Sequence, residues 1–243
     1  MAIVGSLVWI SGIRQDILFS VLYLTWFTKQ PRLHHYNMAI KVLTYLGHTK
    51  DLPLVLGGQT LPSDHSTLSI YGETDASLGT APKGRSTTGH MVRLGESSGA
   101  ILAKSKTTTS VITSSFEAEL DGAATALKSV HRIRNILDEL HIPIQNNQPT
   151  LYSDNQAMIE FIKGNGVAKG IRHMELRMWY LRDKVKRGST DIKYAKGSTL
   201  SADKLTKLGN NVSHFNFTVD IMGLKLLDST TFELYQKLFT ADA

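Results

Sequence analysis

The spacing of hydrophobic and polar positions changes near residue 66 and separates two kinds of region. Residues 1–47 carry apolar positions at helical spacing, and Pro31 interrupts between two predicted helices. In the second of these helices one face is apolar, formed by Ala39, Val42, Leu43 and Leu46. Residues 48–66 contain glycine, proline and several polar residues, which is typical of a loop at a domain boundary.

From about Ser66 onward the pattern predicts alternating strands and helices. The predicted strands cover residues 69–75, 88–94, 100–106, 149–153 and 191–195. The predicted helices cover residues 115–140, 154–163 and 171–186, and a last helix begins near residue 201. Three strands, a long helix and then strand–helix alternation predict an α/β fold with a mixed sheet flanked by helices.

The composition excludes several classes of chemistry and of location. The 243-residue chain has no cysteine, so it has no disulfide, thiolate zinc site or cysteine nucleophile. The apolar stretch from Ile3 ends at Arg14, well short of the roughly 20 residues that cross a bilayer. No basic segment precedes that stretch, so we expect no secretory signal, no membrane partner and a cytoplasmic or nuclear location. The formal net charge of +6 agrees with a nucleic-acid partner without requiring one.

Four acidic residues occupy comparable places in the predicted elements. Asp75 closes the first predicted strand, Glu119 lies in the long helix, Asp154 follows the fourth strand, and Asp203 begins the last helix. Each has an ordinary alternative, because a carboxylate at a strand end is often solvated and an aspartate at a helix start is often an N-cap. Four carboxylates in this order are nevertheless typical of a site that holds two divalent cations for phosphodiester hydrolysis.

The choice between Glu117 and Glu119 depends on helical phase. At about 100° per residue, Glu119 aligns with Ala126 at the edge of the apolar stripe, whereas Glu117 aligns with Asp121 on the solvent side. We therefore expect Glu119 in the site and keep Glu117 as the solvated alternative. Glu73 shares a strand face with Asp75 and is a candidate accessory acid, but we expect it to be exposed.

Five motifs together resemble one known family. Residues 71–77, 85–89, 114–120, 153–155 and 202–207 look like the ribonuclease H domain of copia-type LTR retrotransposon Pol polyproteins. Residues 172–177, Arg-His-Met-Glu-Leu-Arg, resemble the Lys-His-Ile-Asp-Ile-Arg segment of that family. Upstream, residues 5–7, 14–17 and 39–49 resemble the terminal part of the reverse transcriptase that precedes the domain.

The resemblance implies a ribonuclease H-like mixed five-stranded sheet flanked by helices, after a helical N-terminal segment. We expect residues 1–62 to be a helical remnant of the reverse transcriptase C-terminal region and residues 63–210 to be the ribonuclease H-like domain. Residues 211–243 are expected to form a partly helical tail.

The resemblance also implies an endonuclease that cleaves the RNA strand of RNA–DNA hybrids during reverse transcription, using two Mg2+ ions that Mn2+ can replace. Asp75 would bridge both ions, Glu119 and Asp154 would complete one site, and Asp203 would complete the other. The substrate would be told from DNA by its 2′-hydroxyl groups. The other implied partner is the rest of the Pol protein, and the sequence specifies no oligomeric state.

Departures from the family pattern favour a second interpretation. Ser77 and Leu78 stand where the family often has an aspartate and a tryptophan, and Gln15 and Leu208 replace prolines. The chain has no Asp-Asp pair, so it lacks the Tyr-x-Asp-Asp polymerase motif and we expect no polymerase activity. The alternative is a noncatalytic remnant or domesticated nucleic-acid-binding protein of the same fold. A proofreading exonuclease is disfavoured because Ser77 occupies the place of its second acid.

Basic residues near the acids are candidates for contacts with the nucleic-acid backbone. Residues 171–187 contain six lysines and arginines, whose ordinary role is a solvated helix face. A lone histidine is likewise more often structural than functional. The candidate contact residues are Lys104, Lys106, Arg172, His173 and Arg177.

Overall fold

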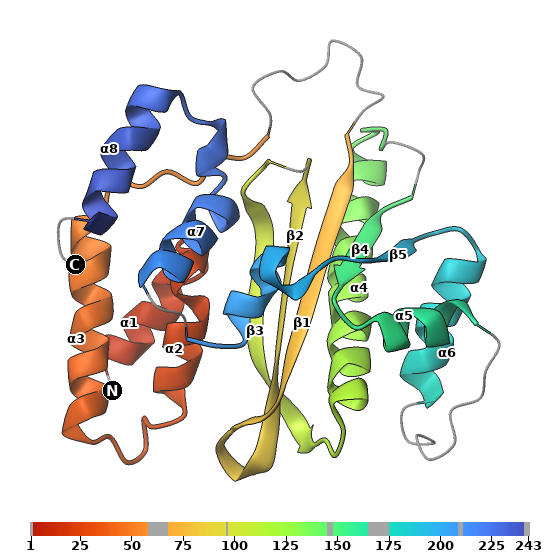
Figure 1. The fold of residues 1–243 in the computed structure, drawn as a ribbon, viewed down its shortest axis with the longest axis horizontal. Coiled ribbons are helices and arrows are strands. Elements are labelled where there is room, and N and C mark those ends of the chain that lie inside the picture. The colour runs from red at the N-terminus through yellow and green to blue at the C-terminus, as the bar shows by residue number, and fades with distance from the viewer. Residues whose placement is uncertain are drawn as a thin grey trace.

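A central sheet separates two groups of helices (Figure 1). The computed structural model describes residues 2–57, 68–95, 97–144, 148–164, 175–208 and 211–240. Helices α1–α3, α7 and α8 lie on one side of the sheet, and α4–α6 lie on the other.

The sheet has five strands in the order β3-β2-β1-β4-β5. The strands are β1 (Ile70–Ala81), β2 (Arg85–Leu94), β3 (Ala100–Val111), β4 (Thr150–Ser153) and β5 (Asp191–Tyr194). The first three are antiparallel neighbours, whereas β4 runs parallel to β1 and β5 runs parallel to β4. Lys83 and Gly84, with φ of 64° and 68°, make the turn between β1 and β2. The expected mixed five-stranded sheet is therefore confirmed.

Helix α4 (Ser115–Glu139) covers one face of the sheet and supplies the largest share of the main core. The Ser114 side chain accepts a hydrogen bond from the Glu117 N–H at 3.2 Å, which caps the helix. Helices α5 (Gln156–Lys163) and α6 (Glu175–Lys186) complete this layer. The main core consists of buried side chains from the sheet and these helices, including Ile70, Val92, Leu120, Leu127, Val130, Leu151 and Ile192.

The N-terminal segment is helical, as expected, and packs around a small core of its own. Its helices are α1 (Ala2–Ile10), α2 (Leu18–Thr25) and α3 (Leu33–His48). The core contains Leu7, Ile17, Val21, Leu24, Ala39 and Leu46. The Trp26 Nε1–H donates to Thr107 Oγ1 of β3 at 2.9 Å, so this segment also contacts the sheet.

Helix α7 (Asn211–Ile221) packs against the 3-10 helix Gln15–Ile17 of the N-terminal segment, and it is followed by α8 (Ser229–Thr240). Phe217 and Ile221 are buried in a second cluster with Met91 of β2. Thr218 lies 3.3 Å from the Tyr45 hydroxyl, which also donates to Asp16. The C-terminal region thus joins the N-terminal helices to the sheet. The expected boundary at residues 62 and 63 lies outside the described residues, and the three-region division stays a prediction.

Several element boundaries differ from those predicted from sequence, and β2 and β3, at Arg85–Leu94 and Ala100–Val111, are both longer than expected. Strand β1 continues past Asp75 to Ala81, because its ladder with β2 continues to the Ala81–Arg85 pair. Helix α5 begins at Gln156 instead of Asp154. The expected helix near residue 201 is a short 3-10 helix, Ser201–Leu205. Within the described residues, no helix combines the length and the apolar character needed to span a membrane.

Candidate metal centre

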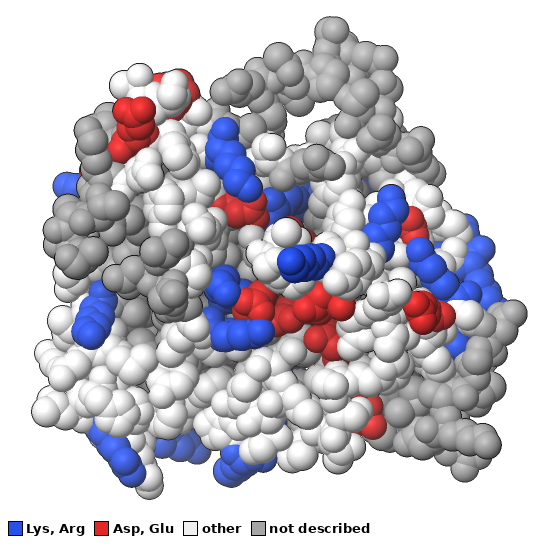
Figure 2. Space-filling view, in the orientation of Figure 1, with Lys and Arg blue, Asp and Glu red and all other residues white. Residues whose placement is uncertain are grey.

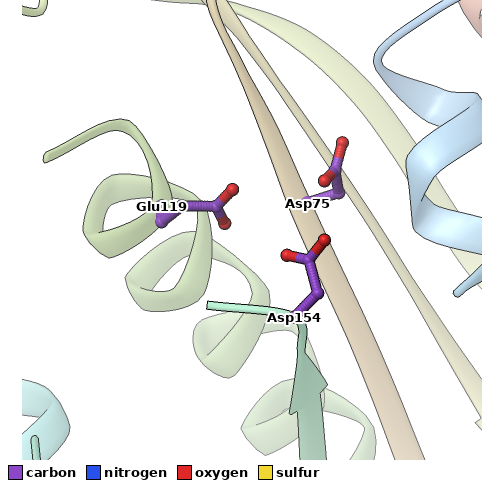
Figure 3. Close-up of side chains that lie close together, drawn as sticks. All are labelled: Asp75, Glu119 and Asp154. Carbon is purple, nitrogen blue, oxygen red and sulfur yellow. The ribbon is translucent and has the colours of Figure 1, made fainter. Parts of the chain in front are cut away.

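Three of the four predicted acids meet at one point of the structure. One carboxylate oxygen from each of Asp75, Glu119 and Asp154 lies within 4.8 Å of the other two. Figure 3 shows Glu119 pointing from α4 towards Asp75 on β1, with Asp154 at the end of β4. Asp75 and Glu119 are buried and Asp154 is half-buried.

The sheet topology explains why these three residues converge. Strand β4 pairs with β1 only at Tyr71–Glu73, so the edge of β1 beyond Glu73 has no strand beside it there. The Ala76 N–H at this edge donates to Glu119 Oε1 at 3.3 Å. Asp154 directly follows the last residue of β4 and therefore reaches the same place. The end of the short parallel strand thus creates the site.

Asp154 is available to the site because its neighbour caps the helix. The Met158 N–H donates to Asn155 Oδ1 at 2.8 Å, and Asn155 is the N-cap of α5. The N-cap alternative for Asp154 is therefore wrong. Gly197 allows the connection after β5 to approach closely, since a Cβ built there would lie 2.5 Å from Asp154 Oδ2.

Both glutamates near the start of α4 are buried, but they have different roles. Glu119 faces the acid cluster as expected. Glu117 is only 5% exposed, so the expectation that it faces solvent is wrong. Its carboxylate turns back to accept hydrogen bonds from the backbone and hydroxyl of Thr113, each at 3.3 Å. Glu117 therefore stabilises the N-terminus of its own helix.

Burial and mutual repulsion disfavour the charged forms of these carboxylates, a cost that a bound cation would relieve. Burial raises the pKa of Asp75 to about 6, and repulsion from Asp203 and Asp154 adds to this effect. Burial raises the pKa of Glu119 to about 8, with further repulsion from Asp75 and Asp154. Glu119 Oε2 is buried and accepts no hydrogen bond from the described residues. An oxygen-rich, buried and partly unsatisfied donor set of this kind fits a hard divalent cation.

Asp203 lies beside this cluster but is not one of its three members. The 3-10 helix that carries it packs on β2 at Gly89, where an added Cβ would lie 2.5 Å from Leu205 Cβ. Lys204 Nζ contacts Asp203 Oδ2 at 2.6 Å, and Lys207 Nζ contacts Oδ1. Burial opposes ionisation of Asp203, but these two lysines outweigh it and lower its pKa.

Thr206 is a site residue that sequence analysis missed. Its hydroxyl lies within hydrogen-bond distance of Asp75 Oδ2 and of the Asp203 backbone carbonyl and shares its one proton between them, so it ties Asp75 to the 3-10 helix of Asp203. The hydrogen bond to Asp75 partly offsets the effect of burial on the Asp75 pKa. Its place three residues after Asp203 in the 202–207 motif was the available signal.

Glu73 is structural rather than exposed, which corrects the expectation from sequence. It forms an ion pair with Arg93 at 2.9 Å and accepts the Ala202 N–H at 3.2 Å. Arg93 also pairs with Asp220 of α7 at 2.6 Å. Glu73 therefore anchors the Asp203 helix and α7 against the sheet.

The basic candidates occupy different positions around the acids. Lys104 and Lys106 are exposed residues of β3. They lie on the sheet face that α4 covers, because Lys104 pairs with His90 and His90 contacts Ser129 of α4. Arg177 forms an ion pair with Asp121 at 2.7 Å. Arg172 and His173 lie outside the described residues. Figure 2 shows acidic side chains gathered near the middle of one face, with lysine and arginine side chains beside them.

Comparisons with known proteins agree with the motif-based resemblance. The chain is 29% identical over 225 residues to the retrovirus-related Pol polyprotein from transposon RE2 of Arabidopsis thaliana, covering 92% of this chain and 15% of the relative. It is 28% identical over 220 residues to the corresponding polyprotein from transposon RE1 of the same plant, covering 90% of this chain and 14% of the relative. The resemblance to copia-type Pol polyproteins is thereby confirmed. The chain spans about 15% of the length of the first of these relatives.

Solved structures similar to the chain include ribonucleases H. LC11-RNase H1, isolated from compost, has 15% identity and a TM-score of 0.45, covering 56% of this chain and 91% of that chain. The same protein in complex with an RNA/DNA hybrid has 13% identity and a TM-score of 0.41, covering 56% of this chain and 93% of that chain. No protein-family model matches the chain.

Proposed function

We propose that the chain is the ribonuclease H portion of a retrotransposon Pol protein and hydrolyses the RNA strand of RNA–DNA hybrids as an endonuclease. The observation that carries this proposal is the convergence of Asp75, Glu119 and Asp154, from three distant parts of the sequence, into one cluster whose carboxylate oxygens lie within 4.8 Å of one another. The similarity to copia-type Pol polyproteins over about nine-tenths of the chain supports it.

The proposed site holds two Mg2+ ions, for which Mn2+ can substitute. Asp75, Glu119 and Asp154 would hold one ion, and Asp75 with Asp203 would hold the other. Bound divalent cations supply an activated water and a Lewis acid for the leaving 3′ oxygen. The carboxylates of the chain keep these charges in place, and Thr206 orients Asp75 through its hydrogen bond.

The remaining assignments are part of the same proposal. Residues 1–62 form the end of the reverse transcriptase region, residues 63–210 form the nuclease domain, and residues 211–243 follow it. The hybrid backbone would contact Lys104, Lys106, Arg172, His173 and Arg177, and recognition of RNA would use its 2′-hydroxyl groups.

Hydrolysis of an end-labelled RNA–DNA hybrid in the presence of Mg2+ or Mn2+ tests the activity. We expect internal cleavage of the RNA strand that yields 5′-phosphate and 3′-hydroxyl ends, and no cleavage of the matching DNA duplex. Asp75→Asn is the control, because it removes the acid shared by both proposed ions. Equal cleavage by the wild-type protein and this variant would attribute the activity to a contaminant.

The alternative is a noncatalytic hybrid-binding protein. The observation that favours it is the pairing of both Asp203 oxygens with lysines. This alternative predicts hybrid binding that weakens steeply with salt, together with no turnover at any Mg2+ or Mn2+ concentration.

A further inference from the structure

Lys207 is placed to act on the whole acidic site. Its ammonium group contacts Asp203 Oδ1, while Lys204 contacts the other oxygen of the same carboxylate. The charge of Lys207 also acts on Asp75 and Glu119, and the charges of Asp75 and Asp154 act on Lys207.

The chain next to Lys207 is anchored to the site, whereas the Lys207 side chain is half in solvent. The preceding residue, Thr206, is 1% exposed and bonds to Asp75, which holds this part of the chain against the site. The Lys207 side chain itself is 51% exposed. A long side chain that is half in solvent can leave Asp203 without disturbing the fold.

The charge balance shows what this arrangement does to cation binding. When ionised, Asp75, Glu119, Asp154 and Asp203 carry four negative charges. Lys204 and Lys207 cancel two of them, and one divalent cation balances the remainder. A second divalent cation on Asp203 would face the Lys207 ammonium group at contact distance, where like charges repel strongly.

We propose that Lys207 is a built-in counter-ion that competes with the second divalent cation for Asp203. The two cation positions then fill in order, the Asp75–Glu119–Asp154 position first and the Asp203 position only when Lys207 withdraws. This inference rests on the proposed function, since it concerns the second of the two ions that the proposed reaction uses. It assigns Lys207 the role of a positioning residue that acts through Asp203.

Titration of the full-length, metal-free protein with Mn2+, without nucleic acid, tests the inference. Isothermal titration calorimetry gives the number of ions and their affinities, and electron paramagnetic resonance distinguishes an isolated Mn2+ from an exchange-coupled pair. At low ionic strength the wild-type protein should bind one ion tightly and a second weakly. Lys207→Met should bind the second ion about tenfold more tightly and give the coupled signal at lower Mn2+ concentration.

Three further variants isolate the role of Lys207. Lys207→Arg keeps the charge and should behave like the wild-type protein. Lys163→Met removes a lysine whose ion pair with Asp191, at 3.0 Å, has similar exposure but lies away from the acids, and it should also behave like the wild-type protein. The double variant Lys207→Met, Asp203→Asn should lose the gained second ion and keep the first.

The outcomes separate this inference from the proposed function. If the first ion binds and the second-ion affinity of Lys207→Met equals that of the wild-type protein, the competition is refuted and the nuclease proposal stands. If Lys163→Met gives the same gain as Lys207→Met, the effect is one of net charge and the inference is refuted as well. If the wild-type protein binds no Mn2+ at all, the proposed function fails and the inference fails with it.

Discussion

Glu119 should make the metal-free protein less stable as the pH rises, and Glu119→Gln should remove this effect. Burial and the nearby acids raise the pKa of Glu119 from its ordinary 4.5 to about 8 in the folded protein. The folded protein therefore keeps a proton at Glu119 that the unfolded chain has already lost. The stabilising contribution of this proton is complete below pH 4.5 and falls as the pH rises to about 8.

The size of the effect follows from that pKa difference. At roughly 1.4 kcal/mol per pH unit, the free energy of unfolding falls by about 5 kcal/mol across this window. Because Asp75 and Glu119 repel each other, part of this pH dependence belongs to Asp75 and not to Glu119. We therefore expect the pH-dependent loss of unfolding free energy to differ by at least about 2 kcal/mol between the wild-type protein and Glu119→Gln. A typical domain has only about 5–15 kcal/mol of stability, so the change is easily measured.

Urea denaturation in EDTA at pH 5 and pH 9 provides the assay. The stability of Glu119→Gln relative to the wild-type protein should increase between the two pH values. Glu139→Gln, an exposed glutamate at the end of the same helix, is the matched control and should show no such increase. Adding Mg2+ at pH 8 should stabilise the wild-type protein more than Glu119→Gln. Parallel pH profiles for the wild-type protein and Glu119→Gln would refute the assignment of Glu119 to a repulsive buried cluster.

Three other substitutions test how the site and the fold are held. Thr206→Val removes the hydroxyl that donates to Asp75 and should weaken Mn2+ binding about tenfold in a titration; unchanged affinity would contradict its orienting role. Gly197→Ala places a Cβ 2.5 Å from Asp154 Oδ2 and should reduce hybrid cleavage about tenfold or more without lowering the melting temperature; full activity would show that the loop adjusts. Arg14→Met leaves the buried carboxylate of Asp16 without its 2.7 Å partner and should cost about 3 kcal/mol in urea denaturation, whereas a loss of less than about 1 kcal/mol would show the pair to be dispensable.

Long periodic segments were predicted well because their signals are local. The helix predicted over residues 115–140 is α4, Ser115–Glu139, and the strands predicted near residues 149–153 and 191–195 are β4 and β5. Apolar spacing, a serine N-cap and flanking glycine or proline act within a few residues of the element that they specify. Helical phase is also a local signal, and it correctly predicted that Glu119 lies on the buried side of α4.

One-residue distinctions at element ends were harder to predict. Asp154 and Asn155 are both good N-cap residues, and their sequence alone does not say which one caps α5. The choice depends on the backbone angles at the end of β4, which its pairing with β1 and β5 determines. Pairing with β2 extends β1 past Asp75, and the end of the β4 pairing at Glu73 leaves the other edge of β1 open for Glu119.

Glu73, which is partly buried, and Glu117, which is buried, show a different limit. A period-based analysis treats a charged residue beside a core face as solvated, because an unpaired buried charge is costly. Arg93, 20 positions away, forms an ion pair with Glu73 and so offsets the cost of removing its charge from water. Arg93 in turn pairs with Asp220, 127 positions further along. Partners at such distances leave no local pattern.

The sequence by itself predicted a set of four acids, and it determined the helix that carries Glu119 and the order of strands and helices along the chain, because motifs and periodicity express short-range preferences. Only the tertiary structure decided that Asp75, Glu119 and Asp154 form a compact group while Asp203 lies beside them, paired with Lys204 and Lys207. It also revealed Thr206 as the link between Asp75 and the Asp203 helix. The physical reason is that distances between side chains from separate strands and helices depend on sheet register and packing, and these arise from the whole chain at once.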